Sequence, residues 1–211
     1  TILNGTALDV PRLERQQARR ALGLADDALV VGAVGRLAPV KDHRTLILAI
    51  ARARVELPGL LTVIAGDGEL GGELRRLVSE HGLNGVVRFA GYRPDVLSLL
   101  PAFDIFAQPS LSEGISLSLL EASAAGLPVV ATGVDGNLET VRGDETGILT
   151  PVGDSEALAR AIVRLGVSRE LREGLGAAGR RYVTARFSFQ RMTRDYEALY
   201  VELARRKGLL R

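Results

Sequence analysis

Short apolar runs that alternate with helical segments constrain the fold of this chain most. The runs carry hydrophobic residues at consecutive positions, which is typical of strands buried on both faces. We expect strands over residues 29–35, 60–66, 86–91, 104–110, 128–133 and 146–150. We expect helices over residues 43–56, 70–81, 94–100, 116–125, 154–165, 169–185 and 188–206. The sequence therefore predicts an α/β fold, a Rossmann-like doubly wound parallel sheet of about six strands with helices on both faces.

The loop after the first expected strand lies at the sheet edge where ligands of such folds bind, and it reads GRLAPVKDH. Gly35 allows a sharp turn. Arg36 and Lys41 combine a fork-shaped guanidinium with a compact ammonium, a pairing that suits a diphosphate. We expect this pair to bind phosphate; the alternative is two solvent-exposed cations. Asp42 is expected to cap the helix that follows.

Two further loops follow the second and third expected strands. The first reads GDGEL and, with Gly71, fits the G-x-G-x-x-G spacing of dinucleotide-binding folds. However, it follows the second strand, and Ala90 and Gly91 stand where an acidic residue is needed, so NAD binding is disfavoured. In the second loop, Tyr92 and Arg93 are placed to flank a nucleotide base, or Tyr92 packs against its neighbours.

The segment SEGISLSLLEASAAGLPVVATG holds two carboxylates, Glu113 and Glu121. Glu113 is expected where a helix begins, and the N–H groups of Gly114 to Leu117 there favour an anion. Glu121 follows about 10–12 Å further along the helix axis, at about 1.5 Å per residue. Two carboxylates so spaced suit two hydroxyl-bearing rings with a diphosphate between them, the layout of a nucleotide sugar. The alternatives are an N-cap or capping-box carboxylate for Glu113 and an exposed helix residue for Glu121.

Composition excludes several classes of function. The chain has no cysteine, which removes disulfides, thiolate metal sites and cysteine nucleophiles. Aromatic residues make up 4% and the formal net charge is +2, so no nucleic-acid partner is expected. His43 and His81 match no catalytic position and are expected on helix surfaces. Arg15, Arg19 and Arg20 are expected on a solvated helix face.

Several motifs occur in a fixed order along nearly the whole chain: VGAVGRLAPVKD, VIAGDGEL, VRFAGYRPD, the E-x7-E signature of Glu113 and Glu121, GNLETV, TGILTPVGD and FSFQRMTRDYEALY. This set resembles the C-terminal, donor-binding domain of retaining glycosyltransferases of the GT-B fold, family 4 (group 1). The resemblance implies a hexosyltransferase that uses a nucleotide diphosphate sugar and needs neither a metal nor another cofactor.

The resemblance also implies a role for each motif residue. The donor-binding residues would be Gly35, Arg36, Lys41, Tyr92, Arg93, Glu113, Gly114, Ile115, Ser116, Leu117 and Glu121. The two cations would bind the diphosphate, the first carboxylate the hexose and the second the ribose. Backbone N–H groups would meet the phosphate and the sugar, and the tyrosine–arginine pair would border the base. Arg36, Lys41 and Glu113 are the catalytic candidates, because the positive groups neutralise the leaving diphosphate.

Four residues depart from the family's pattern. Ile115 stands where an aromatic residue is common, Ser116 where glycine is common, Ser118 where proline is common, and Asp135 where a second glycine is usual. These departures leave the shape of the sugar pocket and the choice of donor open, but not the class of enzyme.

The resemblance divides the chain into three parts. Residues 1–12 are expected to be an interdomain connector, residues 13–186 the nucleotide-sugar-binding domain, and residues 187–211 a C-terminal helix that crosses back to an N-terminal domain. That other domain would hold the acceptor. We therefore expect the fragment to bind the donor without efficient turnover.

The alternatives are a non-catalytic nucleotide-sugar-binding module and a GT-B sugar-nucleotide epimerase, which would need a different set of carboxylates. The donor base is left open among UDP, GDP and ADP, and the acceptor is not identified. We expect a cytoplasmic location. Peripheral association of the parent enzyme with the inner face of the membrane stays open, and no apolar run approaches the about twenty residues of a membrane span.

Overall fold

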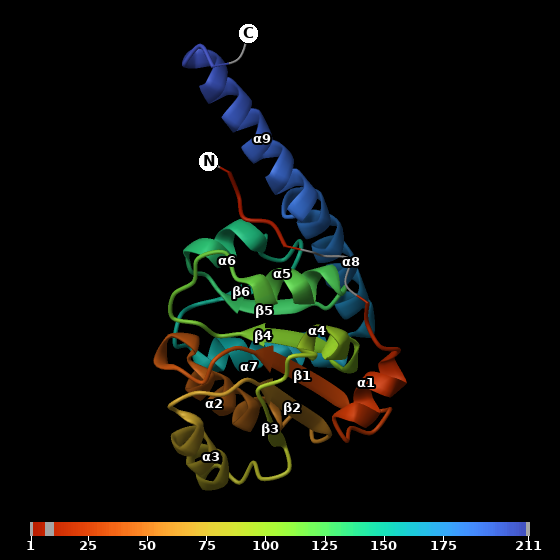
Figure 1. The fold of residues 1–211 in the computed structure, drawn as a ribbon. Helices are drawn as coiled ribbons and strands as arrows, with labels where there is room; N and C mark the ends of the chain where they lie inside the picture. The colour runs from red at the N-terminus through yellow and green to blue at the C-terminus, as the bar shows by residue number, and fades with distance from the viewer. Residues whose placement is uncertain (1, 7–10, 210–211) are drawn as a thin grey trace.

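The computed structural model describes residues 2–6 and 11–209 and shows a parallel sheet between two layers of helices (Figure 1). The strands are β1 (Leu29–Val34), β2 (Leu60–Ala65), β3 (Val87–Gly91), β4 (Ile105–Gln108), β5 (Val129–Thr132) and β6 (Ile148–Thr150). They form one six-stranded sheet in the order β3-β2-β1-β4-β5-β6, and every neighbouring pair is parallel. The order reverses at β1, which is the doubly wound arrangement. The predicted fold class is confirmed.

The helices of the described residues connect these strands in alternation. They are α1 (Arg15–Ala21), α2 (His43–Ala53), α3 (Gly71–Glu80), α4 (Val96–Leu99), α5 (Leu117–Ala124), α6 (Asp135–Thr140), α7 (Ser155–Val167), α8 (Arg169–Arg186) and α9 (Phe189–Arg206), with short 3-10 turns η1 (Pro39–Lys41) and η2 (Leu100–Ala102). The helix expected over residues 94–100 is divided between α4 and η2, and α6 is a helix that the sequence did not predict. None of the described helices has the length and apolar character needed to span a membrane.

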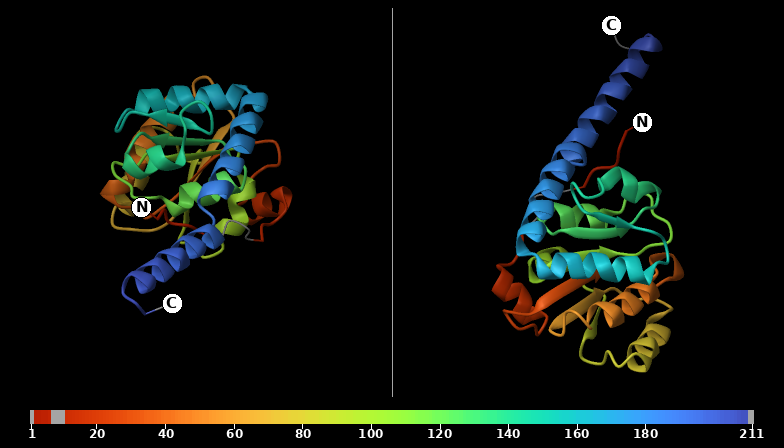
Figure 2. Two further views of the ribbon diagram at one scale, coloured as in Figure 1. Left: turned by 90° about the horizontal axis from the view of Figure 1, so that it is seen from above. Right: turned by 180° about the vertical axis from the view of Figure 1, so that it is seen from behind.

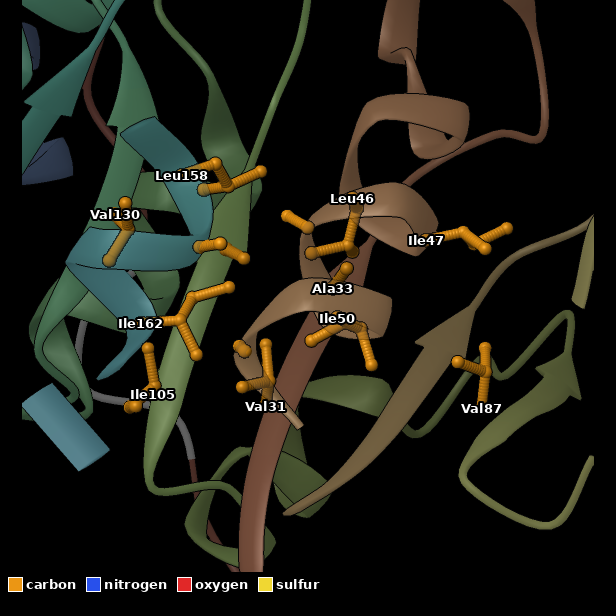
Figure 3. Packing of buried hydrophobic residues seen from close by; sticks show 14 of the residues in the cluster. Val31, Ala33, Leu46, Ile47, Ile50, Val87, Ile105, Val130, Leu158 and Ile162 are labelled. Atoms are coloured by element: carbon orange, nitrogen blue, oxygen red, sulfur yellow. The ribbon is translucent and has the colours of Figure 1, made fainter. Parts of the chain in front are cut away.

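Alternate residues of each strand pack on opposite faces of the sheet. Val31 and Ile105 pack with α2, α3 and α7 on one face. Figure 3 shows their packing with side chains of α2 and α7, and the right-hand view of Figure 2 shows the molecule from behind. Val30 and Phe106 pack on the other face with α1, α4 and α5. Because both faces are covered, neighbouring residues of a strand are both buried. This packing explains the continuous apolar runs of the sequence.

Arg19 of α1 is fully buried, so the expectation of a solvated helix face is wrong for this residue. Its guanidinium donates to the carbonyl oxygens of Ala25, Asp26 and Ala28, at 2.7–2.8 Å. It also donates to Asp104 Oδ2 at 2.8 Å. The ion pair joins α1 to the amino-terminal ends of the central strands, which the local sequence around Arg19 does not indicate.

The N-terminal segment lies against the junction of α8 and α9. Thr6 forms a parallel bridge with Ser188, and its N–H donates to the carbonyl oxygen of Phe187 at 3.0 Å. Beyond this junction α9 extends away from the domain, and none of its residues is buried (Figure 1). The expected boundaries at residues 12 and 186 stay predictions, and residues 1, 7–10 and 210–211 of the two terminal segments lie outside the described residues.

Candidate functional site

The loops that follow the strands are joined by backbone hydrogen bonds at the carboxyl edge of the sheet. The N–H of Leu37 donates to the carbonyl oxygen of Asp67 at 2.9 Å, which ties the loop after β1 to the loop after β2. The N–H of Leu111 donates to the carbonyl oxygen of Val40 at 2.8 Å, which ties the loop after β4 to η1. These bonds bring loops far apart in sequence into one surface.

One end of this surface is hollowed by about 440 Å³. The hollow is lined by Val34, Gly35, Arg36, Ala65, Gly66, Asp67, Tyr92, Arg93 and Val96. Arg36 is exposed, and its guanidinium makes no hydrogen bond or ion pair with a described residue. Tyr92 is 76% exposed, so its ring is not packed against its neighbours. Arg93 is held by Asp95 through two hydrogen bonds of 2.8 Å.

The floor of the hollow requires glycine at one position. Gly66 has φ of +150°, and a Cβ there would lie 1.9 Å from the carbonyl oxygen of Gly35. The second strand therefore ends with its backbone directly against the loop after the first strand. This close approach leaves the hollow open above the backbone of both loops.

Glu113 lies at the other end of the surface, and its side chain is 10% exposed. Its Oε1 atom accepts from Lys41 Nζ at 2.6 Å, from Ser110 Oγ at 2.6 Å and from Gln108 Nε2 at 2.7 Å. The Oε2 atom accepts no hydrogen bond from a described residue. The alternative interpretation of Glu113 as a capping-box carboxylate is wrong, because the carboxylate is committed to Lys41 and to two donors at the end of β4.

Helix α5 begins next to this carboxylate, and its N-cap is Ser116, whose Oγ accepts from the N–H of Leu119 at 3.4 Å. The N–H groups of Ile115, Ser116 and Leu117 donate to no described residue. Free N–H groups at a helix start carry a partial positive charge and are open to an anion. The predicted anion site at this helix is therefore geometrically available.

Gly136 fixes the loop of Glu113 from the far side. Its N–H donates to the carbonyl oxygen of Glu113 at 3.2 Å, and a Cβ at this position would lie 1.6 Å from the carbonyl oxygen of Gly114. The backbone of the first turn of α6 thus packs directly on the loop, which is why position 136 requires glycine. The adjacent position 135, where a second glycine was expected, tolerates Asp135.

Glu121 is half-buried on α5, so the alternative of an exposed helix residue is wrong. Its carboxylate makes no hydrogen bond or ion pair with a described residue. Burial raises its pKa, since leaving water disfavours the charged form. A half-buried carboxylate without a partner is unfavourable in a purely structural role, and it suits a residue that binds a hydroxyl-bearing ligand.

His43 is the first residue of α2 and is 4% exposed, so the prediction of a helix-surface residue is wrong. Its ring lies near the backbone of Gly35 and Arg36, although neither nitrogen makes a hydrogen bond of good geometry. Burial lowers its pKa, and those backbone groups partly oppose the shift.

His81 is exposed as expected. Asp42 caps α2 as predicted, accepting from the N–H of Thr45 at 3.2 Å.

The structure thus brings the predicted site residues together at two places. Gly35, Arg36, Tyr92 and Arg93 surround the hollow, and Lys41 meets Glu113 across 72 residues of sequence. Gln108 and Ser110 were not predicted. The signal that would have found Gln108 is a polar residue at the end of an otherwise apolar strand.

A larger hollow, of about 610 Å³, lies at the opposite, amino-terminal edge of the sheet. Two of its cations are already paired, Arg15 with Asp104 and Arg169 with Glu173. A third, Arg172, donates to two backbone carbonyl groups. Because these cations are engaged, the smaller hollow at the carboxyl edge is the better candidate for an anionic ligand.

Comparison with known proteins gives consistent matches. The profile of the family described as Glycosyl transferases group 1 matches residues 14–182. The lipopolysaccharide core biosynthesis glycosyltransferase LpsE of Rhizobium meliloti is 36% identical over 178 residues, which cover 84% of this chain and 51% of LpsE. The crystal structure of HepE from Anabaena in complex with UDP has a TM-score of 0.86 at 28% identity, covering 95% of this chain and 57% of HepE.

A separate match concerns a single domain. The C-terminal domain of LpcC, a glycosyl transferase group 1 family protein from Francisella tularensis, has a TM-score of 0.79 at 26% identity. The match covers 88% of this chain and 100% of that domain.

The doubly wound sheet and these matches define the class as a GT-B glycosyltransferase domain, of the size of the C-terminal one. The chain belongs to the family of glycosyl transferases group 1. It spans about half the length of the curated relatives it matches, between 46% and 51% for three of them. The resemblance found in the sequence is confirmed.

Proposed function

We propose that this chain is the donor-binding domain of a retaining, metal-independent glycosyltransferase that transfers a hexose from a nucleotide diphosphate sugar. One observation carries the proposal. Glu113 holds one carboxylate oxygen against Lys41 and leaves the other free, beside the free N–H groups of α5. Solved structures of HepE contain UDP and UDP-glucose, which supports a ligand of this chemical class.

In this proposal the nucleotide lies along the carboxyl edge of the sheet. The base enters the 440 Å³ hollow beside Tyr92, where an exposed aromatic ring is free to stack on it. The diphosphate passes between the unpaired Arg36 and the start of α5. Lys41 donates one N–H to Glu113 and keeps two donors for phosphate oxygens.

The two carboxylates bind the two sugars. Oε2 of Glu113 accepts from hydroxyl groups of the transferred hexose. Glu121, which lacks a partner among the described residues, accepts from the ribose hydroxyl groups. Ribose binding would offset the unfavourable burial that raises the pKa of Glu121.

The chemistry proposed for this domain is electrostatic. As the bond from the hexose to the diphosphate breaks, negative charge accumulates on the leaving group, and Arg36, Lys41 and the helix N–H groups stabilise it. Each preorganised donor of this kind contributes about 10²- to 10³-fold in rate. The acceptor attacks the same face of the sugar from a domain outside this chain, so the fragment binds donor with little turnover.

A calorimetric titration tests the proposal. The 211-residue chain is titrated with UDP-glucose, UDP-N-acetylglucosamine, GDP-mannose and ADP-glucose, and with NAD as the control. We expect one nucleotide sugar to bind and NAD not to bind. Binding of NAD in preference to every nucleotide sugar, or no binding of any of them, would contradict the proposal.

A further inference from the structure

Gln108 is the last residue of β4 and is 4% exposed. Its Nε2 donates to Glu113 Oε1 at 2.7 Å and to Ser116 Oγ at 2.6 Å. Its Oε1 accepts from Ser118 Oγ at 3.2 Å. The amide is therefore held at both ends, and its orientation is fixed by its partners.

Gln108 is one of three donors that hold the Glu113 carboxylate. Three donors converge on one oxygen, and each comes from a different anchor: Lys41 from η1, Ser110 from the loop after β4 and Gln108 from the strand itself. The strand is the most rigid of the three, because β4 pairs with β1 and β5. With Oε1 fixed in this way, Oε2 is the oxygen left for a ligand.

The stability of the domain does not by itself require an amide at this position. Burying an amide costs free energy unless all its groups are hydrogen-bonded, whereas an apolar side chain of similar volume avoids that cost. Phe106 of the same strand and Leu119 of α5 belong to an apolar cluster. Glu113, Ser116 and Ser118 are the partners that satisfy the hydrogen bonds of the buried amide.

We infer that Gln108 is a positioning residue that orients Glu113 toward the hexose of the donor, with Ser116 and Ser118 holding the amide in place. The inference rests on the proposed function. It predicts a larger effect on a nucleotide sugar than on the nucleotide alone, since Glu113 is placed against the hexose and acts on the diphosphate only through Lys41.

The test uses Gln108→Met, which keeps the volume and removes the donor. Dissociation constants are measured for UDP-glucose and for UDP, with Ser112→Ala, an exposed residue of the same loop, as the matched control. We expect Gln108→Met to weaken UDP-glucose binding about 10- to 100-fold and to leave UDP binding within about 2-fold. Gln108→His returns a donor of similar reach and is expected to recover part of the loss. Ser112→Ala should change neither constant.

A double-mutant cycle distinguishes positioning from a general structural effect. In a Glu113→Ala background, Gln108→Met is expected to add no further loss of UDP-glucose affinity, because its target is gone. Equal losses for UDP and UDP-glucose, a loss that persists without Glu113, or an unchanged UDP-glucose affinity would each overturn the inference.

A crystal structure of the Gln108→Met variant without a ligand tests whether Gln108 orients the Glu113 carboxylate. A Glu113 carboxylate rotated away from its present orientation supports the inference, and an unchanged orientation overturns it. If the unsubstituted chain binds neither UDP nor any nucleotide sugar, the proposed function fails separately, and this structure still tests the role of Gln108.

Discussion

Gly136 in the first turn of α6 supports the loop of Glu113. The substitution Gly136→Ala has two opposing effects on the stability of the domain. A helical alanine is more favourable than glycine by about 1 kcal/mol, which favours the variant. However, the new Cβ would lie 1.6 Å from the carbonyl oxygen of Gly114. The loop must move by about 1.8 Å to restore an ordinary contact, which costs about 1–3 kcal/mol or more in a packed region.

We therefore expect Gly136→Ala to lower the free energy of unfolding by up to about 2 kcal/mol, which lowers Tm by up to about 8 °C for a chain of this size. Because the displaced loop carries Glu113, nucleotide-sugar affinity should fall about 10- to 100-fold. Thermal denaturation and calorimetry measure the two effects on the same samples.

The matched control is Gly133→Ala in the preceding loop. A Cβ there would lie 3.8 Å from its nearest neighbour, the carbonyl oxygen of Thr150, so no clash arises. We expect a change within about 0.5 kcal/mol. A Gly136→Ala variant that is more stable than the parent chain and binds nucleotide sugar normally would refute the reasoning.

Three further predictions concern charged residues. Arg36→Ala should leave Tm unchanged, because the guanidinium of Arg36 pairs with no described residue. It should weaken nucleotide diphosphate binding about 10- to 100-fold, measured by calorimetry with Arg44→Ala as the control. A fall in Tm would contradict this prediction. Arg19→Met should lower stability by about 1–3 kcal/mol, because it leaves three carbonyl groups without their donor and removes one of the two cations paired with the half-buried Asp104, whereas exposed Arg20→Met should be nearly neutral in denaturant unfolding. Glu121→Gln should raise Tm at pH 7 and weaken nucleotide-sugar binding. Burial raises the pKa of Glu121, so the folded state holds the proton of this group more tightly than the unfolded chain does. The protonated group therefore contributes stability at low pH, and this contribution is lost as the pH rises from the unfolded pKa through the folded pKa. As the pH falls from 7 to 4, the parent chain should therefore gain stability relative to Glu121→Gln, which melting curves at the two pH values measure.

The sheet was predictable because its strands are apolar on both faces, and each observed strand lies within its predicted range. Helix α6 was not predicted. Its sequence, DGNLET, combines glycine, asparagine and threonine, which have low helix propensity, and its place is set by packing on the loop of Glu113.

The burial and the contacts of individual side chains were harder to predict from the sequence than which side chains belong to the site. His43 and Arg19 were expected on surfaces, because the sequence shows neither the loop over His43 nor the distant Asp104 that pairs with Arg19. The sequence did indicate Lys41 and Glu113 as members of one site. It gave no sign that the two are in contact, or that Gln108 and Ser110 complete the contact.

The most direct test of the donor-binding proposal is a crystal structure of this chain with the nucleotide sugar that binds best in the titration. We expect the base in the hollow beside Tyr92, the diphosphate against Arg36, Lys41 and the start of α5, and a hexose hydroxyl on Oε2 of Glu113. A nucleotide bound at the amino-terminal edge of the sheet, or a hexose that does not contact Glu113, would contradict the account.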